Sequence, residues 1–175
     1  MIGGRMEAAA FHYGKGKLAW DYNALRPMTR IRLATAQDLD RVLPLMRDFY
    51  AFERLPFKET RARGVLLQLL SDERLGRLTV FERRDETLAG YLVLGFGFSV
   101  EFGGRDALLD EFYVAPEDRG QGIGRAALDF ALEQCRAAGI RAVHLEGDHF
   151  NQRAHEFYLR CGFKDHARHL MTKWL

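Results

Sequence analysis

Three glycines within five residues precede the most regular helical pattern of this chain. The segment EDRGQGIGRAALDFAL, residues 117–132, contains Gly120, Gly122 and Gly124, and its later apolar residues recur at helical spacing. Backbone N–H groups at the start of a helix have no intrahelical acceptor, and glycines let a phosphate approach them closely. The segment therefore predicts a phosphate-binding loop that leads into a helix.

Three kinds of phosphate loop compete for this segment. A P-loop needs Gly-Lys followed by Ser or Thr, but here Gly124 is followed by Arg125 and Ala126. A dinucleotide loop reads G-x-G-x-x-G and opens a parallel sheet, with an acidic residue about 20 positions on. Glu146 lies at a suitable distance, but this loop reads G-x-G-x-G and comes late in the chain. The remaining option is the pyrophosphate of an acyl-CoA, which needs no side-chain cation.

The rest of the chain predicts a mixed α/β sheet. Thr35 and Asp38 form a capping box before a helix that continues to residue 53, and Pro44 lies within that helix. Residues 76–116 hold three strand-like runs, with a hairpin turn at Gly103-Gly104. The other expected elements are strands at 29–34, 140–147 and in the last ten residues, and helices at 62–72, 123–138 and 151–161.

Length and composition predict one globular domain. The chain has 175 residues, of which 47% are hydrophobic, and a net charge of +2 with the charges interspersed. This charge pattern gives no reason to expect binding to nucleic acid or to a membrane. Cys135 and Cys161 are the two cysteines, and Cys135 falls on an apolar helix face, so we expect a reduced, cytoplasmic protein.

Residues 1–29 differ from the domain expected at 30–175. They are rich in Gly and Lys but include four aromatic residues, Phe11, Tyr13, Trp20 and Tyr22. Aromatic residues are uncommon in a solvated tail. We therefore expect part of this N-terminal extension to pack on the domain or on a partner chain, as in a homodimer.

Two motifs together resemble the GCN5-related N-acetyltransferase (GNAT) superfamily. RGQGIG at 119–124 matches the (Arg/Gln)-x-x-Gly-x-(Gly/Ala) motif of that superfamily, and NQRAHEFYLRCGF at 151–163 is similar to its second recognisable segment. Within the superfamily, LLDEFYV at 108–114 and FYAFERLPF at 49–57 are similar to the spermidine/spermine and thialysine acetyltransferase branch. The order and separation of the two motifs carry the resemblance.

The resemblance implies a GNAT-like fold that binds acetyl-CoA. Its sheet is twisted and mostly antiparallel, with a central pair of parallel strands, here 108–114 and 141–146, that splay apart between flanking helices. Pantetheine would lie along the opened edge, and the N–H near Phe112 would polarise the thioester carbonyl. The implied cofactor-binding residues are Phe112, Tyr113, Val114, Arg119, Gly120, Gln121, Gly122, Ile123, Gly124, Arg125, Asn151 and Tyr158. Asn151 also suits the N-cap of the helix that follows it.

The implied reaction moves an acetyl group from acetyl-CoA to a primary amine by direct attack in a ternary complex. Tyr158 is the candidate general acid for the CoA thiolate, although it also suits a core position beside Phe157. An alkyl amine has a pKa near 10.4 and must lose a proton before attack. Asp110 and Glu111 are adjacent strand residues that face opposite sides unless a bulge intervenes, and the resemblance favours Asp110 as the base.

Other roles follow from the same residues. Glu53 and Glu111 are candidates for receiving a cationic, small-molecule amine acceptor, and Glu146 and His149 are further candidates. The histidines show no metal-ligand spacing, so we expect no metal. A non-catalytic acyl-CoA-binding regulatory protein remains the alternative, because it needs the glycine loop but neither Tyr158 nor a base.

Overall fold

The computed structural model describes residues 29–147, 150–166 and 168–175. The chain forms two compact units, Met1–Leu145 and Glu146–Leu175. Nearly all of the N-terminal extension, together with His149, lies outside the described residues. The first unit contains the whole sheet, and the second contains one helix followed by an irregular C-terminal segment.

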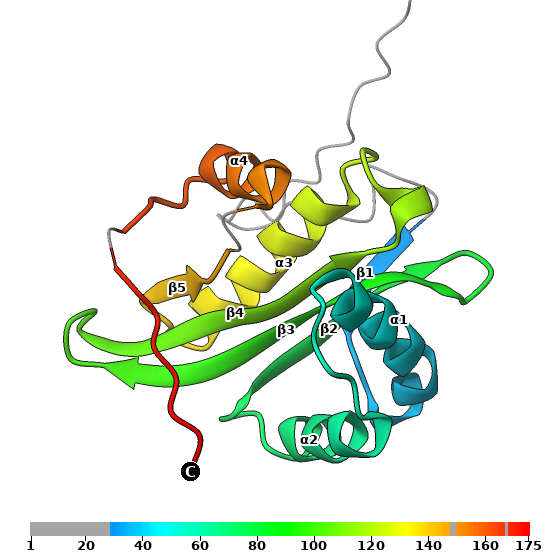
Figure 1. Ribbon diagram of the computed structural model, residues 1–175, viewed down its shortest axis with the longest axis horizontal. Helices are drawn as coiled ribbons and strands as arrows, with labels where there is room; N and C mark the ends of the chain where they lie inside the picture. The colour runs from blue at the N-terminus through cyan, green and yellow to red at the C-terminus, as the bar shows by residue number, and fades with distance from the viewer. Residues whose placement is uncertain (1–28, 148–149, 167) are drawn as a thin grey trace, which may run out of the picture. The chain divides into compact units, whose positions relative to one another are not determined.

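A five-stranded mixed sheet forms the first unit (Figure 1). Its strands are β1 (Thr29–Leu33), β2 (Gly76–Arg83), β3 (Leu88–Ser99), β4 (Gly104–Val114) and β5 (Ala142–Leu145), in that spatial order. The β1–β2, β2–β3 and β3–β4 pairs are antiparallel, and only β4 and β5 run parallel. The sequence prediction of a mixed, mostly antiparallel sheet is confirmed.

The helices are α1 (Leu39–Phe52), α2 (Glu59–Ser71) and α3 (Ile123–Ala137) in the first unit and α4 (Gln152–Arg160) in the second. The expected capping box is present as a short 3-10 turn before α1, where the Thr35 N–H donates to the Asp38 carboxylate at 2.8 Å. α1 continues through Pro44. Gly139, with φ +73°, follows α3 and ends it in the left-handed conformation that glycine favours.

The strand register divides the core between the two faces of the sheet. Tyr91, Val93 and Tyr113 share one face, and they pack with apolar residues of α1 and α2. α3 packs against β1, β2 and β4 on the other face. Figure 1 shows α1 and α2 on the opposite side of the sheet from α3. The largest buried side chains of the sheet include Tyr91, Phe81, Leu78, Leu92 and Leu94.

A β-bulge interrupts the pairing of β3 and β4. Leu109 pairs with Leu94 and Glu111 pairs with Val93, so Asp110 has no partner residue on β3. Because paired residues share a face, the extra residue reverses the alternation of β4. The side chain of Glu111 therefore lies on the α1 face, while Leu109 lies on the α3 face.

The parallel pair lies at one edge of the described sheet, whereas we expected it at the centre. Residues 168–175 form no strand, although their sequence predicted one. Leu170, Met171 and Trp174 are exposed there. An alternating pattern makes a segment compatible with a strand, but a strand forms only where a neighbouring backbone pairs with it. β5 therefore forms the edge of the described sheet.

Candidate functional site

The glycine loop has the backbone conformation that its sequence predicts. Gly120 has φ +74° and Gly122 has φ +82°, both in the left-handed region that glycine adopts most readily. Gly122 is the N-cap residue of α3, and the first hydrogen bond of the helix runs from the Ala126 N–H to the Gly122 carbonyl at 3.1 Å. The N–H groups before Ala126 therefore have no intrahelical acceptor, and they lie at the positive end of the helix dipole.

The long polar side chains of the loop turn back to the protein. The Arg119 Nε donates to the Val114 carbonyl at 2.8 Å, and the Gln121 Nε2 donates to the Glu117 carbonyl at 3.1 Å. The Arg125 Nε contacts the Asp129 carboxylate at 2.9 Å. These contacts anchor the three side chains beside the loop, whose backbone amides lie at the start of α3.

The pairing of β4 with β5 ends at the bulge. Their pairing ends at Leu109 and Leu145, but β4 continues for five more residues to Val114. The Ala115 N–H bonds the Ala89 carbonyl at 2.8 Å on the β3 side. Backbone groups alternate along a strand, so those of Phe112 and Val114 face the opposite edge. The predicted splay would use this edge for pantetheine, and the Arg119 Nε already occupies the Val114 carbonyl at its end.

Tyr113 lies between these two edge residues but faces the core. Its ring packs near those of Phe49 and Tyr91, with centroids 6.2 and 6.3 Å away, and the Arg119 guanidinium lies 5.6 Å from it. Its backbone groups face β3 by the same alternation. Of the three predicted residues on this strand, Phe112 and Val114 therefore direct their backbone groups away from β3.

Glu111 is a buried carboxylate held by two phenols. The Tyr50 Oη donates to Oε1 at 2.9 Å, and the Tyr91 Oη donates to Oε2 at 2.7 Å. Desolvation raises the pKa of Glu111, the two phenol bonds oppose this rise, and the nearby Asp110 charge adds to it. The hydrogen bonds join the last turns of α1 to β4, so Glu111 has a clear structural role.

Asp110, the bulge residue, differs from Glu111 in exposure and in hydrogen bonding. Its side chain is exposed, and within the described residues it makes no hydrogen bond or ion pair. Nearby protein atoms still desolvate its carboxylate and raise the pKa above the ordinary value. A carboxyl group with a raised pKa and no partner is able to accept a proton from a neighbouring molecule.

The second unit contains Asn151 and Tyr158. The Asn151 side chain accepts a hydrogen bond from the Ala154 N–H at 3.1 Å, which confirms its predicted N-cap role for α4. The Tyr158 ring packs edge-on near Phe157 and Phe163, with centroids 5.3 and 5.6 Å away. Glu146 is the first residue of the second unit, and His149 lies outside the described residues. The other predicted site residues belong to the first unit, where Glu53 follows the last residue of α1.

The sequence did not reveal the role of Tyr50 and Tyr91. Both residues were visible only as members of apolar patterns, Tyr50 at helical spacing and Tyr91 in a strand-like run. Their contact with Glu111 joins residues 61 and 20 positions apart. No local signal in the sequence indicates such a pairing.

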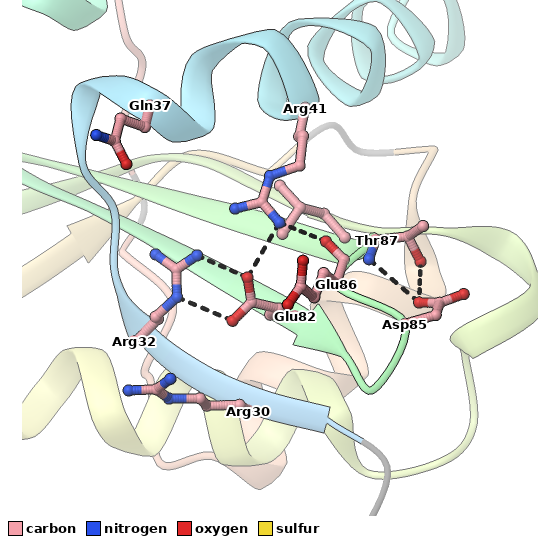
Figure 2. Close-up of a pocket in the computed structure, with 9 residues that line it drawn as sticks. Arg30, Arg32, Gln37, Arg41, Glu82, Asp85, Glu86 and Thr87 are labelled. Atoms are coloured by element: carbon pink, nitrogen blue, oxygen red, sulfur yellow. Dashed lines mark hydrogen bonds and ion pairs between the residues drawn. The ribbon is translucent and has the colours of Figure 1, made fainter.

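A charged pocket lies elsewhere in the first unit, between β1, α1 and the β2–β3 hairpin (Figure 2). Arg32 and Arg41 bond the Glu82 carboxylate, and both also bond Asp38, whose side chain is almost fully buried. The two arginines hold the pKa of Asp38 well below its usual range. The network stabilises the start of α1, and we assign it a structural role.

Within the described ranges, no group of three or more His, Cys, Asp or Glu side chains lies in an arrangement suited to a metal ion. The helices of these ranges include none with the length and apolar character needed to cross a bilayer.

The mixed sheet, with its parallel β4–β5 pair and a glycine loop at the start of α3, has the arrangement that the sequence motifs led us to expect of an acyl-CoA transferase. The comparison with known families agrees. The model of the acetyltransferase (GNAT) family matches residues 39–163, and the chain belongs to this family. It is therefore an acetyl-CoA-dependent acetyltransferase, as the sequence motifs predicted.

Characterised relatives and solved structures are consistent with this family. The chain is 31% identical over 138 residues to aminoalkylphosphonate N-acetyltransferase of Salmonella typhimurium, covering 79% of this chain and 86% of the relative. It is 32% identical over 84 residues to thialysine N-epsilon-acetyltransferase of Bos taurus, covering 48% and 49%. An integron cassette protein from the Cole Harbour Salt Marsh metagenome superposes with a TM-score of 0.73 at 32% identity, covering 83% and 90%. Glucosamine-6-phosphate N-acetyltransferase of Arabidopsis thaliana shares the fold, with a TM-score of 0.68 at 16% identity, covering 83% and 97%.

Proposed function

We propose that this protein transfers the acetyl group of acetyl-CoA to a primary amine of a small molecule, in a ternary complex. The relatives support the acceptor class, because one is named for aminoalkylphosphonates and another for the ε-amine of thialysine. The observation that carries the proposal is the carboxylate of Asp110, which the bulge places where β4 and β5 separate.

The donor is proposed to bind along the opened edge of β4. Backbone groups of Phe112 and Val114 pair with pantetheine, and the N–H groups from Gly120 to Arg125 hold the pyrophosphate. Arg119 supports this edge by binding the Val114 carbonyl. Asn151 contacts the pantetheine arm in addition to capping α4.

The proposed chemistry is a direct attack on the thioester. Asp110 accepts a proton from the ammonium form of the acceptor, and the amine nitrogen then forms a bond to the carbonyl carbon. The N–H near Phe112 stabilises the oxyanion while the C–S bond breaks. Tyr158 donates a proton to the departing thiolate, and the second amine proton leaves to solvent. Glu53 and Glu111 add negative charge on the acceptor side.

The organisation of the protein follows from the same proposal. We treat residues 30–175 as one acetyltransferase domain, because the family match at 39–163 extends across both compact units. Burial raises the pKa of the Cys135 thiol to about 11, so this thiol stays protonated at neutral pH. A cytoplasmic location is proposed from the sequence. A homodimer remains a prediction from the sequence.

The direct test incubates the protein with acetyl-CoA and a panel of amines and follows the release of free thiol. We expect turnover with at least one primary amine, and we expect Tyr158→Phe to lower kcat. Unchanged turnover in Tyr158→Phe would remove that residue from the mechanism. Calorimetric binding of acetyl-CoA without thiol release for any amine would instead favour a non-catalytic acyl-CoA-binding protein.

A further inference from the structure

Two carboxylates lie immediately before the proposed pyrophosphate loop. Glu117 and Asp118 belong to the 3-10 turn Pro116–Asp118, which follows β4 and leads into the loop. The Asp118 N–H donates to the Ala115 carbonyl at 2.9 Å and closes this turn. A diphosphate bound by the amides from Gly120 onward would approach both carboxylates, and like charges repel. A cation that offsets these two charges would therefore favour binding of the donor.

Arg83, the last residue of β2, bonds both carboxylates. Its Nη2 donates to the Glu117 Oε1 at 3.1 Å, and its Nε donates to the Asp118 Oδ2 at 3.2 Å. The Asp118 side chain is only 13% exposed in this contact. In the part of the chain that the structure describes, no other cation pairs with either carboxylate. Arg83 therefore ties the turn before the loop to the β2–β3 hairpin.

The hairpin holds the Arg83 guanidinium in place. The Arg83 Nη1 donates to the Thr87 hydroxyl oxygen at 3.0 Å, and the Arg83 backbone N–H donates to the Thr87 carbonyl at 2.8 Å. The Thr87 hydroxyl donates in turn to the Asp85 carboxylate at 2.6 Å, as Figure 2 shows. A planar guanidinium that is already oriented loses little freedom when it binds carboxylates. Arg83 is therefore a pre-organised cation beside the turn.

The arginines of the loop itself have other partners. The Arg119 Nε donates to the Val114 carbonyl, and the Arg125 Nε pairs with the Asp129 carboxylate. Resting on the proposed function, we propose that Arg83 is a positioning residue for acetyl-CoA. It fixes the turn that precedes the loop and offsets the charge of the two carboxylates, which lowers the repulsion on an incoming diphosphate.

The test compares two acetyl donors, acetyl-CoA and S-acetylpantetheine, which lacks the diphosphate. The acceptor is an amine that the wild type acetylates. Arg83→Gln should raise the KM of acetyl-CoA about three- to tenfold, while the KM of S-acetylpantetheine stays within about twofold of the wild-type value. Arg83→Lys keeps the charge and should raise the KM of acetyl-CoA less. A general loss of structure would raise both KM values together.

A triple variant separates the charge of Arg83 from its role in local structure. Arg83→Gln combined with Glu117→Gln and Asp118→Asn leaves no uncompensated carboxylate, so the KM of acetyl-CoA should return to within about twofold of wild type. Arg77→Gln is the matched control, because Arg77 lies on the same strand and pairs with the exposed Glu73 at 3.2 Å, and it should change neither KM. An unchanged acetyl-CoA KM in Arg83→Gln, an equal rise for both donors, or no recovery in the triple variant would overturn the proposal.

Calorimetry with CoA separates this proposal from the proposed function, because it needs no turnover. CoA should bind more weakly to Arg83→Gln than to the wild type. The difference should shrink between about 0.1 M and about 1 M salt, because the Debye length falls from about 10 Å to about 3 Å. CoA binding that depends on Arg83 without any acetyl transfer would leave this proposal standing and refute the proposed function. Acetyl transfer with the same CoA affinity in both proteins would do the reverse.

Discussion

Leu109 and Glu111 are two residues apart in β4, yet their side chains lie on opposite faces of the sheet. Leu109 pairs with Leu94 and Glu111 with Val93, and the extra residue between them, Asp110, forms a bulge. Without the bulge, both side chains would point to the same face. The bulge therefore gives one strand a buried carboxylate on the α1 face and an exposed carboxylate where the strands separate.

Asp110→Asn should lower kcat/KM by about 10²–10³-fold, because general-base catalysis contributes on that scale. Desolvation raises the pKa of Asp110, so the wild-type rate should rise with pH through a value above the ordinary one for aspartate. This acidic limb should be missing in the variant. A pH profile of kcat/KM for both proteins measures it, and an unchanged acidic limb in Asp110→Asn would argue against a base role.

Gly120→Ala should raise the KM of acetyl-CoA. The left-handed φ of +74° costs a side-chain-bearing residue about 1–2 kcal/mol, and relief of that strain would rotate the amides away from the pyrophosphate. Gly139→Ala is the matched control, because Gly139 has φ +73° at the other end of α3 and equally open surroundings.

Both alanine variants should lose similar stability in thermal unfolding, but only Gly120→Ala should show the changed KM. If the two variants had the same KM for acetyl-CoA, the loop would not be the pyrophosphate site.

Tyr91→Phe should lower the free energy of unfolding by about 1.5–3 kcal/mol at neutral pH, since it removes a buried hydrogen bond to a charged group. Burial raises the pKa of Glu111, so its ionisation costs the folded state free energy as the pH rises above the ordinary value for glutamate, and the Tyr91 bond reduces that cost. The loss in Tyr91→Phe should therefore grow as the pH rises from about 4 to 7. Denaturant unfolding at several pH values measures it, and a pH-independent loss would mean that Glu111 stays protonated.

Asp38→Asn should lower the free energy of unfolding by about 2–4 kcal/mol, because it replaces a buried carboxylate that accepts the Thr35 N–H in the turn before α1 and binds two arginines. The arginines lower the pKa of Asp38, so its contribution is present above the unfolded-state pKa and disappears as the pH falls through the folded-state value. The difference between wild type and variant should shrink below about pH 4. Thermal unfolding from pH 2 to pH 7 tests this, with acetyl-CoA KM as the control for an intact site.

Short patterns in the sequence determined the local conformation of the glycine loop and of two helix starts. The glycines of RGQGIG predicted an amide-lined loop, and positive φ angles at Gly120 and Gly122 confirm it. The capping box at Thr35 and Asp38 and the N-cap at Asn151 were also readable, because each depends on residues within three positions. These features follow from short-range steric and hydrogen-bonding rules that the tertiary structure does not alter.

The features that depend on how strands and distant segments pair were decided only by the tertiary structure. The sequence left open which of Asp110 and Glu111 is buried on the α1 face, because a single inserted residue reverses the alternation of a strand. The contacts of Glu111 with Tyr50 and Tyr91 join segments far apart in the chain. A strand-like segment at 168–175 stayed irregular, because pairing partners rather than local pattern decide where a strand forms.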